Sequence, residues 1–390
     1  MGKTVTVMLV ALEASADNLG ANLAIALRRR LGQKVRFVGV GGARMAAEGI
    51  ESPFDTQELA IVGFVEAWKA YPRVRKHLDE TLEVAHREKP DVVVLIDAWA
   101  FTIRVAQRMR KEMPDVPLVK YVAPQLWATR PGRAKTLAAT VDHLLAIHKM
   151  DLPFFEKVGL PTTFVGNATL TRDFSRTDPA RTRALIGAGP KDRILLMLPG
   201  SRKGEIRYVM PAFKDAVDIL VKTRPDLKIV LPVAAQVADL VNAQLAGWSQ
   251  HVHVVEDDTS KADAFAAATA ALACSGTITT ELALAGAPMV VAYKVDGPTA
   301  MMARLLLRTK WITLFNIAAK AFVAPELIQE DCTGPKIAAA VAPLLDDPAR
   351  RGRQIAEQNV ALEMMGRGIA DPANKSAETI ISILKQRGRL

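Results

Sequence analysis

Three small residues, Ser275-Gly276-Thr277, follow a short apolar run and could bind a phosphate group. The residues from Thr277 onward have a helical pattern, and Glu281 lies one turn further on. The N-terminus of a helix attracts phosphate because it carries unpaired N–H groups and a partial positive charge. Gly276 would let a diphosphate approach the backbone, and Glu281 could accept a hydrogen bond from a sugar hydroxyl. The alternative is an ordinary turn in which Ser275 caps the helix.

A second turn of this kind occurs earlier in the chain, in the sequence LPGSR. Gly200 and Ser201 are expected to expose backbone donors, and Arg202 could hold a phosphate with two hydrogen bonds. The alternative is a surface turn with a solvated arginine. These two turns together predict a site for a phosphorylated ligand in the second half of the chain.

Asp97 ends the apolar run VVVLID, which has the length of a buried strand. A carboxylate at the carboxyl end of a parallel strand could act as a general base toward a sugar hydroxyl. The alternative role is that of a helix cap.

Two other loops of the first half hold polar residues that could contact a second substrate. Glu13, Ser15 and Asp17 lie in ALEASADNLG, where Ser15 or Asp17 could instead cap the following helix. Gln125 and Trp127 lie in VAPQLW, and both are possible ligand contacts.

Two amides near the end of the second half could bind sugar hydroxyls. Asn316 lies in an apolar stretch, where a buried amide needs a partner, so local turn bonds are the alternative. Gln329 is expected on a short helix that begins near Pro325.

Apolar runs of strand length alternate with helical patterns along the whole chain, which indicates parallel βαβ units. The pattern restarts after a charged stretch with prolines and glycines at 171–190. The predicted class is therefore α/β, with two doubly wound, Rossmann-like domains and a ligand cleft at the carboxyl ends of their strands. We expect domains at 1–172 and 190–370, with a last helix within 372–390 that packs back on the first domain.

The composition limits the classes of protein and site. The 390 residues carry a net charge of +10, which fits an anionic membrane surface better than nucleic acid because no nucleic-acid motif accompanies it. We expect no signal peptide and no membrane-spanning helix. Cys274 and Cys332 fit a reducing cytoplasm. The six histidines form no HExxH motif, so we expect no metal site.

Two segments mix aromatic or aliphatic residues with basic ones, at 62–76 and 301–311. Such segments can lie on an anionic membrane or hold acyl chains. The alternative is a pair of helices that face the core.

The ordered set of motifs resembles the lipid-A-disaccharide synthase family. The resemblance runs along nearly the whole chain through ALEASADNLG, FVGVGGARMAAEGI, LIDA, VAPQLWA, LPGSR, ACSGTITTELAL and TLFNIAAKAFVAPELIQE. It implies the GT-B glycosyltransferase fold. It also implies an inverting transfer from UDP-2,3-diacylglucosamine to 2,3-diacylglucosamine 1-phosphate, without a cofactor or metal, by a cytoplasmic enzyme at the inner membrane of a Gram-negative bacterium.

The resemblance also implies roles for single residues. Ser275, Gly276, Thr277 and Glu281 would hold the UDP part of the donor. Ser201, Arg202, Asn316 and Gln329 would be further donor-side contacts, with Arg202 and Asn316 acting in catalysis, and Asp97 would be the base. Glu13, Ser15, Asp17, Gln125 and Trp127 would lie on the acceptor or lipid side.

The chain departs from the family pattern mainly in its first half. Leu12 and Ala16 stand where the family usually has glycines, and Asn167 stands where a histidine is usual. The family sequence IDAPDFN reads IDAWAFT here. A UDP-sugar transferase with a different lipid acceptor is therefore an alternative, and a non-catalytic membrane scaffold is another. A nucleic-acid-binding protein ranks last because charge is its single support.

Overall fold

The chain forms two compact units in a computed structural model that describes residues 4–59, 71–126, 132–306 and 309–390. The first unit comprises Met1–Ala168 and Ile369–Leu390, and the second comprises Thr169–Gly368. Each unit holds one parallel, six-stranded sheet with helices on both faces. Among the described residues, no helix combines the length and the apolar character that crossing a bilayer requires.

The sheet of the first unit has the strand order β2-β1-β3-β4-β5-β6. Its strands are β1 (Val5–Val10), β2 (Val35–Val40), β3 (Val92–Ile96), β4 (Leu118–Tyr121), β5 (His143–Ala146) and β6 (Thr162–Phe164). Helices α1 (Ala14–Leu31) and α17 (Pro372–Gln386) pack together over one face. The other face is covered mainly by α4 (Tyr71–Glu88), α5 (Trp99–Glu112), α6 (Arg133–Ala138) and α7 (Leu152–Glu156).

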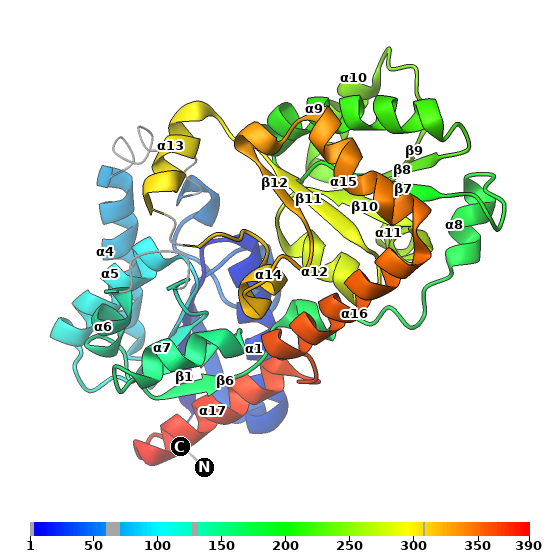
Figure 1. The fold of residues 1–390 in the computed structure, drawn as a ribbon. Helices are drawn as coiled ribbons and strands as arrows, with labels where there is room; N and C mark the ends of the chain where they lie inside the picture. The colour runs from blue at the N-terminus through cyan, green and yellow to red at the C-terminus, as the bar shows by residue number, and fades with distance from the viewer. Residues whose placement is uncertain (1–3, 60–70, 127–131, 307–308) are drawn as a thin grey trace. The chain divides into compact units, whose positions relative to one another are not determined.

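The sheet of the second unit has the order β12-β11-β10-β7-β8-β9, which can be followed in Figure 1. Its strands are β7 (Ile194–Leu198), β8 (Lys228–Pro232), β9 (Val252–Val255), β10 (Ala270–Ala273), β11 (Met289–Tyr293) and β12 (Glu326–Ile328). The predicted start of a helix near Pro325 is wrong, because Glu326–Ile328 pairs with β11 as an edge strand. The helix begins instead at Gln329, which lies with Glu330 in the short 3₁₀ helix Gln329–Asp331. The edge strand is only three residues long, too short for alternation to reveal it.

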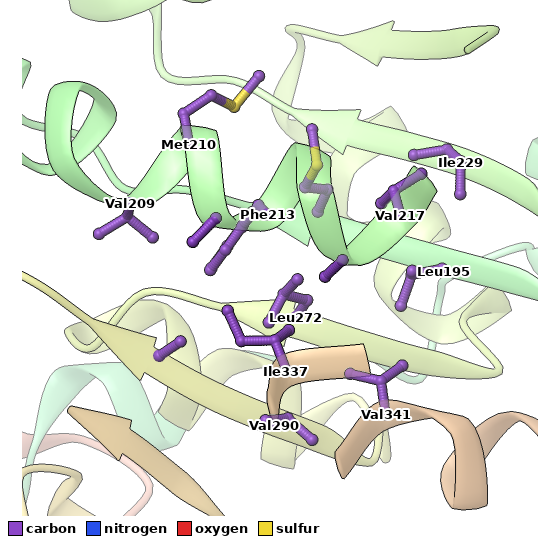
Figure 2. Packing of buried hydrophobic residues seen from close by; sticks show 14 of the residues in the cluster. Leu195, Val209, Met210, Phe213, Val217, Ile229, Leu272, Val290, Ile337 and Val341 are labelled. Atoms are coloured by element: carbon purple, nitrogen blue, oxygen red, sulfur yellow. The ribbon is translucent and has the colours of Figure 1, made fainter. Parts of the chain in front are cut away.

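The central strands are apolar throughout because both faces of each sheet are buried. In β7, Leu195 and Met197 pack on one face, and the alternating residues Ile194, Leu196 and Leu198 pack on the other. Figure 2 shows the first of these cores, where Phe213 and Val217 of α9 (Lys203–Thr223) lie over the sheet. Helix α15 (Gly334–Asp346) completes that layer. The opposite face packs against α11 (Asp258–Ala267), α12 (Thr277–Leu284), α14 (Leu314–Ala319) and α16 (Pro348–Met365).

The segment at 171–190, which the sequence places between the domains, belongs to the second unit. It contains α8 (Pro179–Leu185), and Phe174 packs near Phe265 with 6.4 Å between ring centroids. Asp263, which is almost fully buried, accepts a hydrogen bond from the backbone of Asp178 at 2.7 Å. These contacts tie the segment to α11, so the chain passes from one unit to the other just before it.

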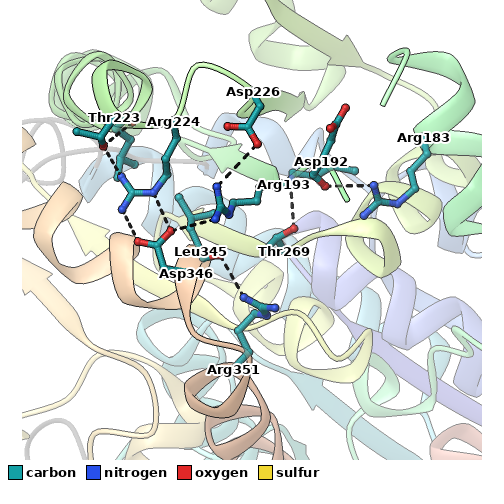
Figure 3. Close-up of polar contacts among 12 residues, drawn as sticks. Arg183, Asp192, Arg193, Thr223, Arg224, Asp226, Thr269, Leu345, Asp346 and Arg351 are labelled. Carbon is teal, nitrogen blue, oxygen red and sulfur yellow. Dashed lines mark hydrogen bonds and ion pairs between the residues drawn. The ribbon is translucent and has the colours of Figure 1, made fainter. Parts of the chain in front are cut away.

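Charged side chains pair with one another at the amino ends of the second sheet. Arg193 precedes β7 and lies 3.8 Å from Asp226 and 3.6 Å from Asp346. Arg224 binds Asp346 as well, and this hydrogen bond lowers the pKa of the Asp346 carboxyl. Figure 3 shows this chain of ion pairs. These two arginines and two aspartates therefore neutralise one another.

The two amphipathic segments of the sequence lie partly outside the described residues. Residues 62–70 of the first are not described, and 71–76 form the start of α4. In the second, 301–306 end α13 (Gly297–Leu306), and 307–308 are not described. A lipid contact by either segment stays a prediction.

Candidate functional site

The second sheet reverses its strand order between β7 and β10. From β7 the chain adds β8 and β9 on one side, and then β10, β11 and β12 on the other. In open α/β sheets, ligands bind at the carboxyl ends of the strands where the order reverses. Both phosphate-binding turns predicted from the sequence lie at this place, since Leu198 pairs with Ala273 and the Cys274 N–H donates to the Leu198 carbonyl at 2.8 Å.

The turn at 275–277 presents open backbone donors. Gly276 has φ 154 and ψ −167, in a region that only glycine adopts readily. Apart from its two chain neighbours, no described residue lies within 4 Å of the position that a β-carbon would take. Within the described part of the chain, the N–H groups of Gly276, Thr277 and Ile278 find no acceptor. The Ser275 hydroxyl donates instead to the Ile312 carbonyl, at the long distance of 3.4 Å. These three N–H groups begin α12, so they form a site suited to an anion.

The turn in LPGSR differs from the prediction at Ser201, because the backbone donors of Ser201 and Arg202 are already occupied. The N–H groups of Ser201 and Arg202 donate to one carboxylate oxygen of Glu205, at 2.9 and 3.2 Å. Gly200 is required here, since a β-carbon at this position would meet the same carboxylate at 2.4 Å. The Arg202 side chain is 80% exposed and lies 3.1 Å from Glu205. This turn therefore contributes an exposed guanidinium, and its Ser201 and Arg202 N–H groups are not open to a ligand.

Glu281 lies in α12 and is paired with Arg172, a residue that the sequence analysis did not select. Burial raises the pKa of the Glu281 carboxyl, and the Arg172 guanidinium opposes that shift. Arg172 itself stacks over Phe174 at 5.4 Å. Among the described residues, this pairing involves one oxygen of the carboxylate, so the other could accept a hydrogen bond from a ligand.

The two amides of this unit make local bonds. Asn316 is fully buried, and its side-chain NH₂ donates to the Ala324 carbonyl at 2.9 Å and to Glu326 at 2.8 Å. Its oxygen accepts from the Ala324 N–H at 3.0 Å. These are the local bonds weighed as the alternative, and a donor contact by Asn316 stays a prediction. Gln329 follows β12 on the same sheet edge, with its side-chain oxygen 3.4 Å from the Val295 N–H.

The first sheet reverses its order between β1 and β3, and Asp97 lies at the end of β3. Asp97 and Ala98 both adopt left-handed backbone angles, with φ 48 and φ 38. Such angles cost about 1–2 kcal/mol for a residue other than glycine. The Asp97 carboxylate accepts no hydrogen bond from the described residues, and α5 begins without a side-chain cap. The alternative of a helix cap is therefore wrong, and the carboxylate is available for chemistry.

Lys120 lies beneath this turn in β4, where it is 2% exposed. Its ammonium group donates to the backbone carbonyl of Asp97 and to the hydroxyl of Thr102 at 2.8 Å. Burial lowers the pKa of Lys120 to about 7, and the nearby Asp97 charge opposes part of that shift. The sequence signal for this residue is the one basic side chain in the apolar run LVKYV, which was not among the predicted site residues.

The remaining residues predicted in the first unit lie in different settings. Glu13 and Ser15 are exposed after β1, beside the place where the strand order reverses. Asp17 is buried and does not cap its own helix. It accepts from the N–H groups of Gly42, Arg44 and Met45 at 2.8 to 3.0 Å, and so caps α2 (Ala43–Ala47).

The loop after β4 is described only in part. Gln125 is exposed there, and Trp127 lies outside the described residues. Acceptor-side contacts by Glu13, Ser15, Asp17, Gln125 and Trp127 stay predictions.

Comparison with known proteins identifies the family. A family model described as lipid-A-disaccharide synthetase matches residues 7–381. The chain is 40% identical to the lipid-A-disaccharide synthase of Rhodospirillum centenum, over 99% of this chain and 96% of the relative. It is also 40% identical to that of Paramagnetospirillum magneticum, over 97% of this chain and 98% of the relative.

This chain belongs to the lipid-A-disaccharide synthase family. The resemblance found in the motifs is thereby confirmed, and with it the enzyme class, a hexosyltransferase of lipid A biosynthesis. These relatives share one name, so neither of them favours the alternative of a different acceptor.

Solved structures agree with the fold of this lipid-A-disaccharide synthase family member. The chain of S. aureus MnaA, solved with UDP, is 16% identical, with a TM-score of 0.62 over 99% of this chain and 98% of that one. A calicheamicin glycosyltransferase is 17% identical, with a TM-score of 0.59 over 99% of both chains. The predicted class of two Rossmann-like domains in a GT-B fold is confirmed.

Lys120 makes the stability of this family member depend on pH in a defined direction. The folded pKa of about 7 lies below the ordinary 10.5, so between these values the unfolded chain binds more protons. The free energy of unfolding of the wild type should therefore rise relative to that of Lys120→Met as the pH increases from 7 to 10. Urea unfolding at several pH values measures this difference. A difference that stays constant, or that falls with pH, contradicts the burial of a titrating lysine.

Proposed function

We propose that this protein transfers a diacylglucosamine unit from its UDP-activated form to 2,3-diacylglucosamine 1-phosphate. The products are a β-1,6-linked disaccharide 1-phosphate and UDP. The observation that carries the proposal is the position of the open N–H groups of residues 276–278 where the second sheet reverses its strand order. Membership of the family supplies the choice of sugars.

The donor is proposed to bind to the second unit through its diphosphate. The N–H groups of Gly276, Thr277 and Ile278 would bind the phosphate oxygens. The hydroxyl of Thr277, on the same turn, would donate a further hydrogen bond to them. Arg202 would leave Glu205 for the diphosphate, since its side chain is exposed and held by one ion pair. Glu281 would accept a hydrogen bond from a ribose hydroxyl.

Asp97 is proposed to act as the general base on the acceptor. Its carboxylate takes the proton of the 6-hydroxyl while that oxygen forms a bond to the anomeric carbon of the donor. The bond between the anomeric carbon and the UDP oxygen breaks, and the diphosphate leaves with the electron pair. Backbone N–H groups and the Arg202 guanidinium stabilise the charge that develops on the departing oxygen.

The reaction can be measured with purified protein and the two acylated substrates. We expect release of UDP and formation of the disaccharide 1-phosphate, detected by mass spectrometry. Asp97→Asn should lower kcat by about 10²–10⁴-fold, because it removes the base while it keeps the size of the side chain. Asp115→Asn is the matched control, since Asp115 is exposed in the same unit and belongs to no proposed site.

Two results would contradict the proposed reaction. Wild-type turnover by Asp97→Asn would exclude Asp97 as the base. UDP release with a different lipid acceptor, but none with 2,3-diacylglucosamine 1-phosphate, would establish the alternative of a divergent acceptor.

Gly276→Ala tests the donor site alone. Alanine at these backbone angles costs about 1–3 kcal/mol, so the turn should shift and its N–H groups should no longer converge. We expect the affinity for UDP, measured by isothermal titration calorimetry, to fall about tenfold or more. Gly352→Ala in α16 is the control, because that position has ordinary helical geometry and open space. An unchanged affinity in Gly276→Ala would exclude the turn as the diphosphate site.

We also infer that the protein binds the surface of the anionic inner membrane, where its acylated substrates reside. The net charge of +10 supports this, as do the exposed apolar side chains of Met301 and Phe322. The protein should sediment with phosphatidylglycerol vesicles at low salt, and much less with phosphatidylcholine vesicles or at 0.5 M salt. Equal sedimentation with both lipids, or none with either, would contradict an electrostatic contact.

A further inference from the structure

The buried Lys120 has a specific relation to the turn that carries Asp97. Strand β4 is buried along its whole length, and Lys120 lies on the face that α5 covers, next to Leu95 of β3 in the sheet register. A lysine is almost never fully buried unless its amine has partners. Every partner that the structure gives this amine belongs to the turn between β3 and α5 or to the first turn of α5.

Two side-chain groups converge on the backbone carbonyl of Asp97. The Lys120 amine donates to it directly. The Thr102 hydroxyl lies 2.7 Å from the same oxygen, and it also accepts a hydrogen bond from Lys120 at 2.8 Å. Thr102 and Lys120 are therefore hydrogen-bonded to each other and to the same carbonyl oxygen.

This carbonyl belongs to the residue whose backbone most needs support. Asp97 and Ala98 are consecutive non-glycine residues in the left-handed region, and such residues persist where the surrounding structure holds them. On the other side, the Asp97 N–H donates to the Tyr121 carbonyl at 2.9 Å. The N–H and the carbonyl of Asp97 are thus both hydrogen-bonded to β4 or α5. These bonds fix the backbone of Asp97, and the backbone sets the direction of its side chain.

We propose that Lys120 is a positioning residue for glycosyl transfer, which holds the left-handed turn at Asp97 and so directs the Asp97 carboxylate toward the acceptor hydroxyl. The proposal rests on the assignment of Asp97 as the base. Lys120 acts through hydrogen bonds and does not touch the substrate.

The amine can hold the turn over a wide range of pH. Burial lowers the pKa of Lys120 to about 7, so the group is partly neutral near neutral pH. A neutral amine still has two N–H donors, which suffice for the Asp97 carbonyl and the Thr102 hydroxyl. The Asp97 carboxylate is the charged group that acts on Lys120, and it opposes part of the effect of burial.

Substitution of Lys120 tests the proposal through the kinetics of the full-length enzyme. Lys120→Met keeps the length of the side chain and removes the donor. We expect kcat to fall about 10- to 100-fold, while KM for each substrate changes less than about twofold, because the carboxylate is displaced and binding is not. Lys111→Met, at an exposed position on α5, should keep the wild-type kcat. A wild-type kcat in Lys120→Met would overturn the proposal.

Thr102 provides a second variant in case Lys120→Met folds poorly. Thr102→Val removes the hydroxyl but keeps the shape, and it should lower kcat in the same way. Thr102→Ser restores the hydroxyl and should recover most of the lost activity. Equal kcat values of the valine and serine variants would show that the Thr102 hydroxyl does not hold the turn at Asp97, and would overturn the proposal.

A double variant separates this proposal from the assignment of the base. If Lys120 acts through Asp97, then Lys120→Met should cause no further loss of kcat in the Asp97→Asn background. A further loss of 10-fold or more would show that Lys120 acts in some other way, and would overturn the proposal. An active Asp97→Asn enzyme would instead overturn the base itself, which is a distinct result.

Discussion

In each parallel sheet the chain adds strands first on one side of a central strand and then on the other. Where the direction changes, the loops that follow two neighbouring strands must lead away from each other. Neighbouring loops there lead to helices on opposite faces, so the space between them stays open. In the first unit this place lies between β1 and β3, and in the second between β7 and β10. The proposed base lies at the first of these places and the open N–H groups at the second. The positions of the proposed chemistry thus follow from the order in which strands are added.

Within the second unit, competition for backbone donors decides which turn can bind an anion. Both turns precede helices and both contain a glycine, so their sequences look equivalent. In one turn, the Glu205 carboxylate occupies the N–H groups of Ser201 and Arg202. In the other, the equivalent third helical position is Thr279, whose hydroxyl donates to the Gly276 carbonyl at 2.8 Å and occupies none of the N–H groups. The open site at 276–278 therefore depends on the absence of a carboxylate at that position.

Sequence patterns predicted the strands well where apolar runs were long, because burial on both faces leaves a continuous signal. They failed at Glu326–Ile328, because three residues are too few to show the alternation of a strand. Asp97 could be found from its place at the end of a strand, but its left-handed backbone could not, since the sequence there contains no glycine. Lys120 was visible as a charge in an apolar run, yet its partners come from α5 and from the turn after β3, which lie far from it in sequence.

The proposed reaction depends on a nucleotide bound where the second sheet reverses its strand order. A crystal structure of the protein with UDP measures this directly. We expect diphosphate oxygens within hydrogen-bond distance of the N–H groups of Gly276, Thr277 and Ile278, with Glu281 near the ribose. A diphosphate bound elsewhere, with these N–H groups unoccupied, would contradict it.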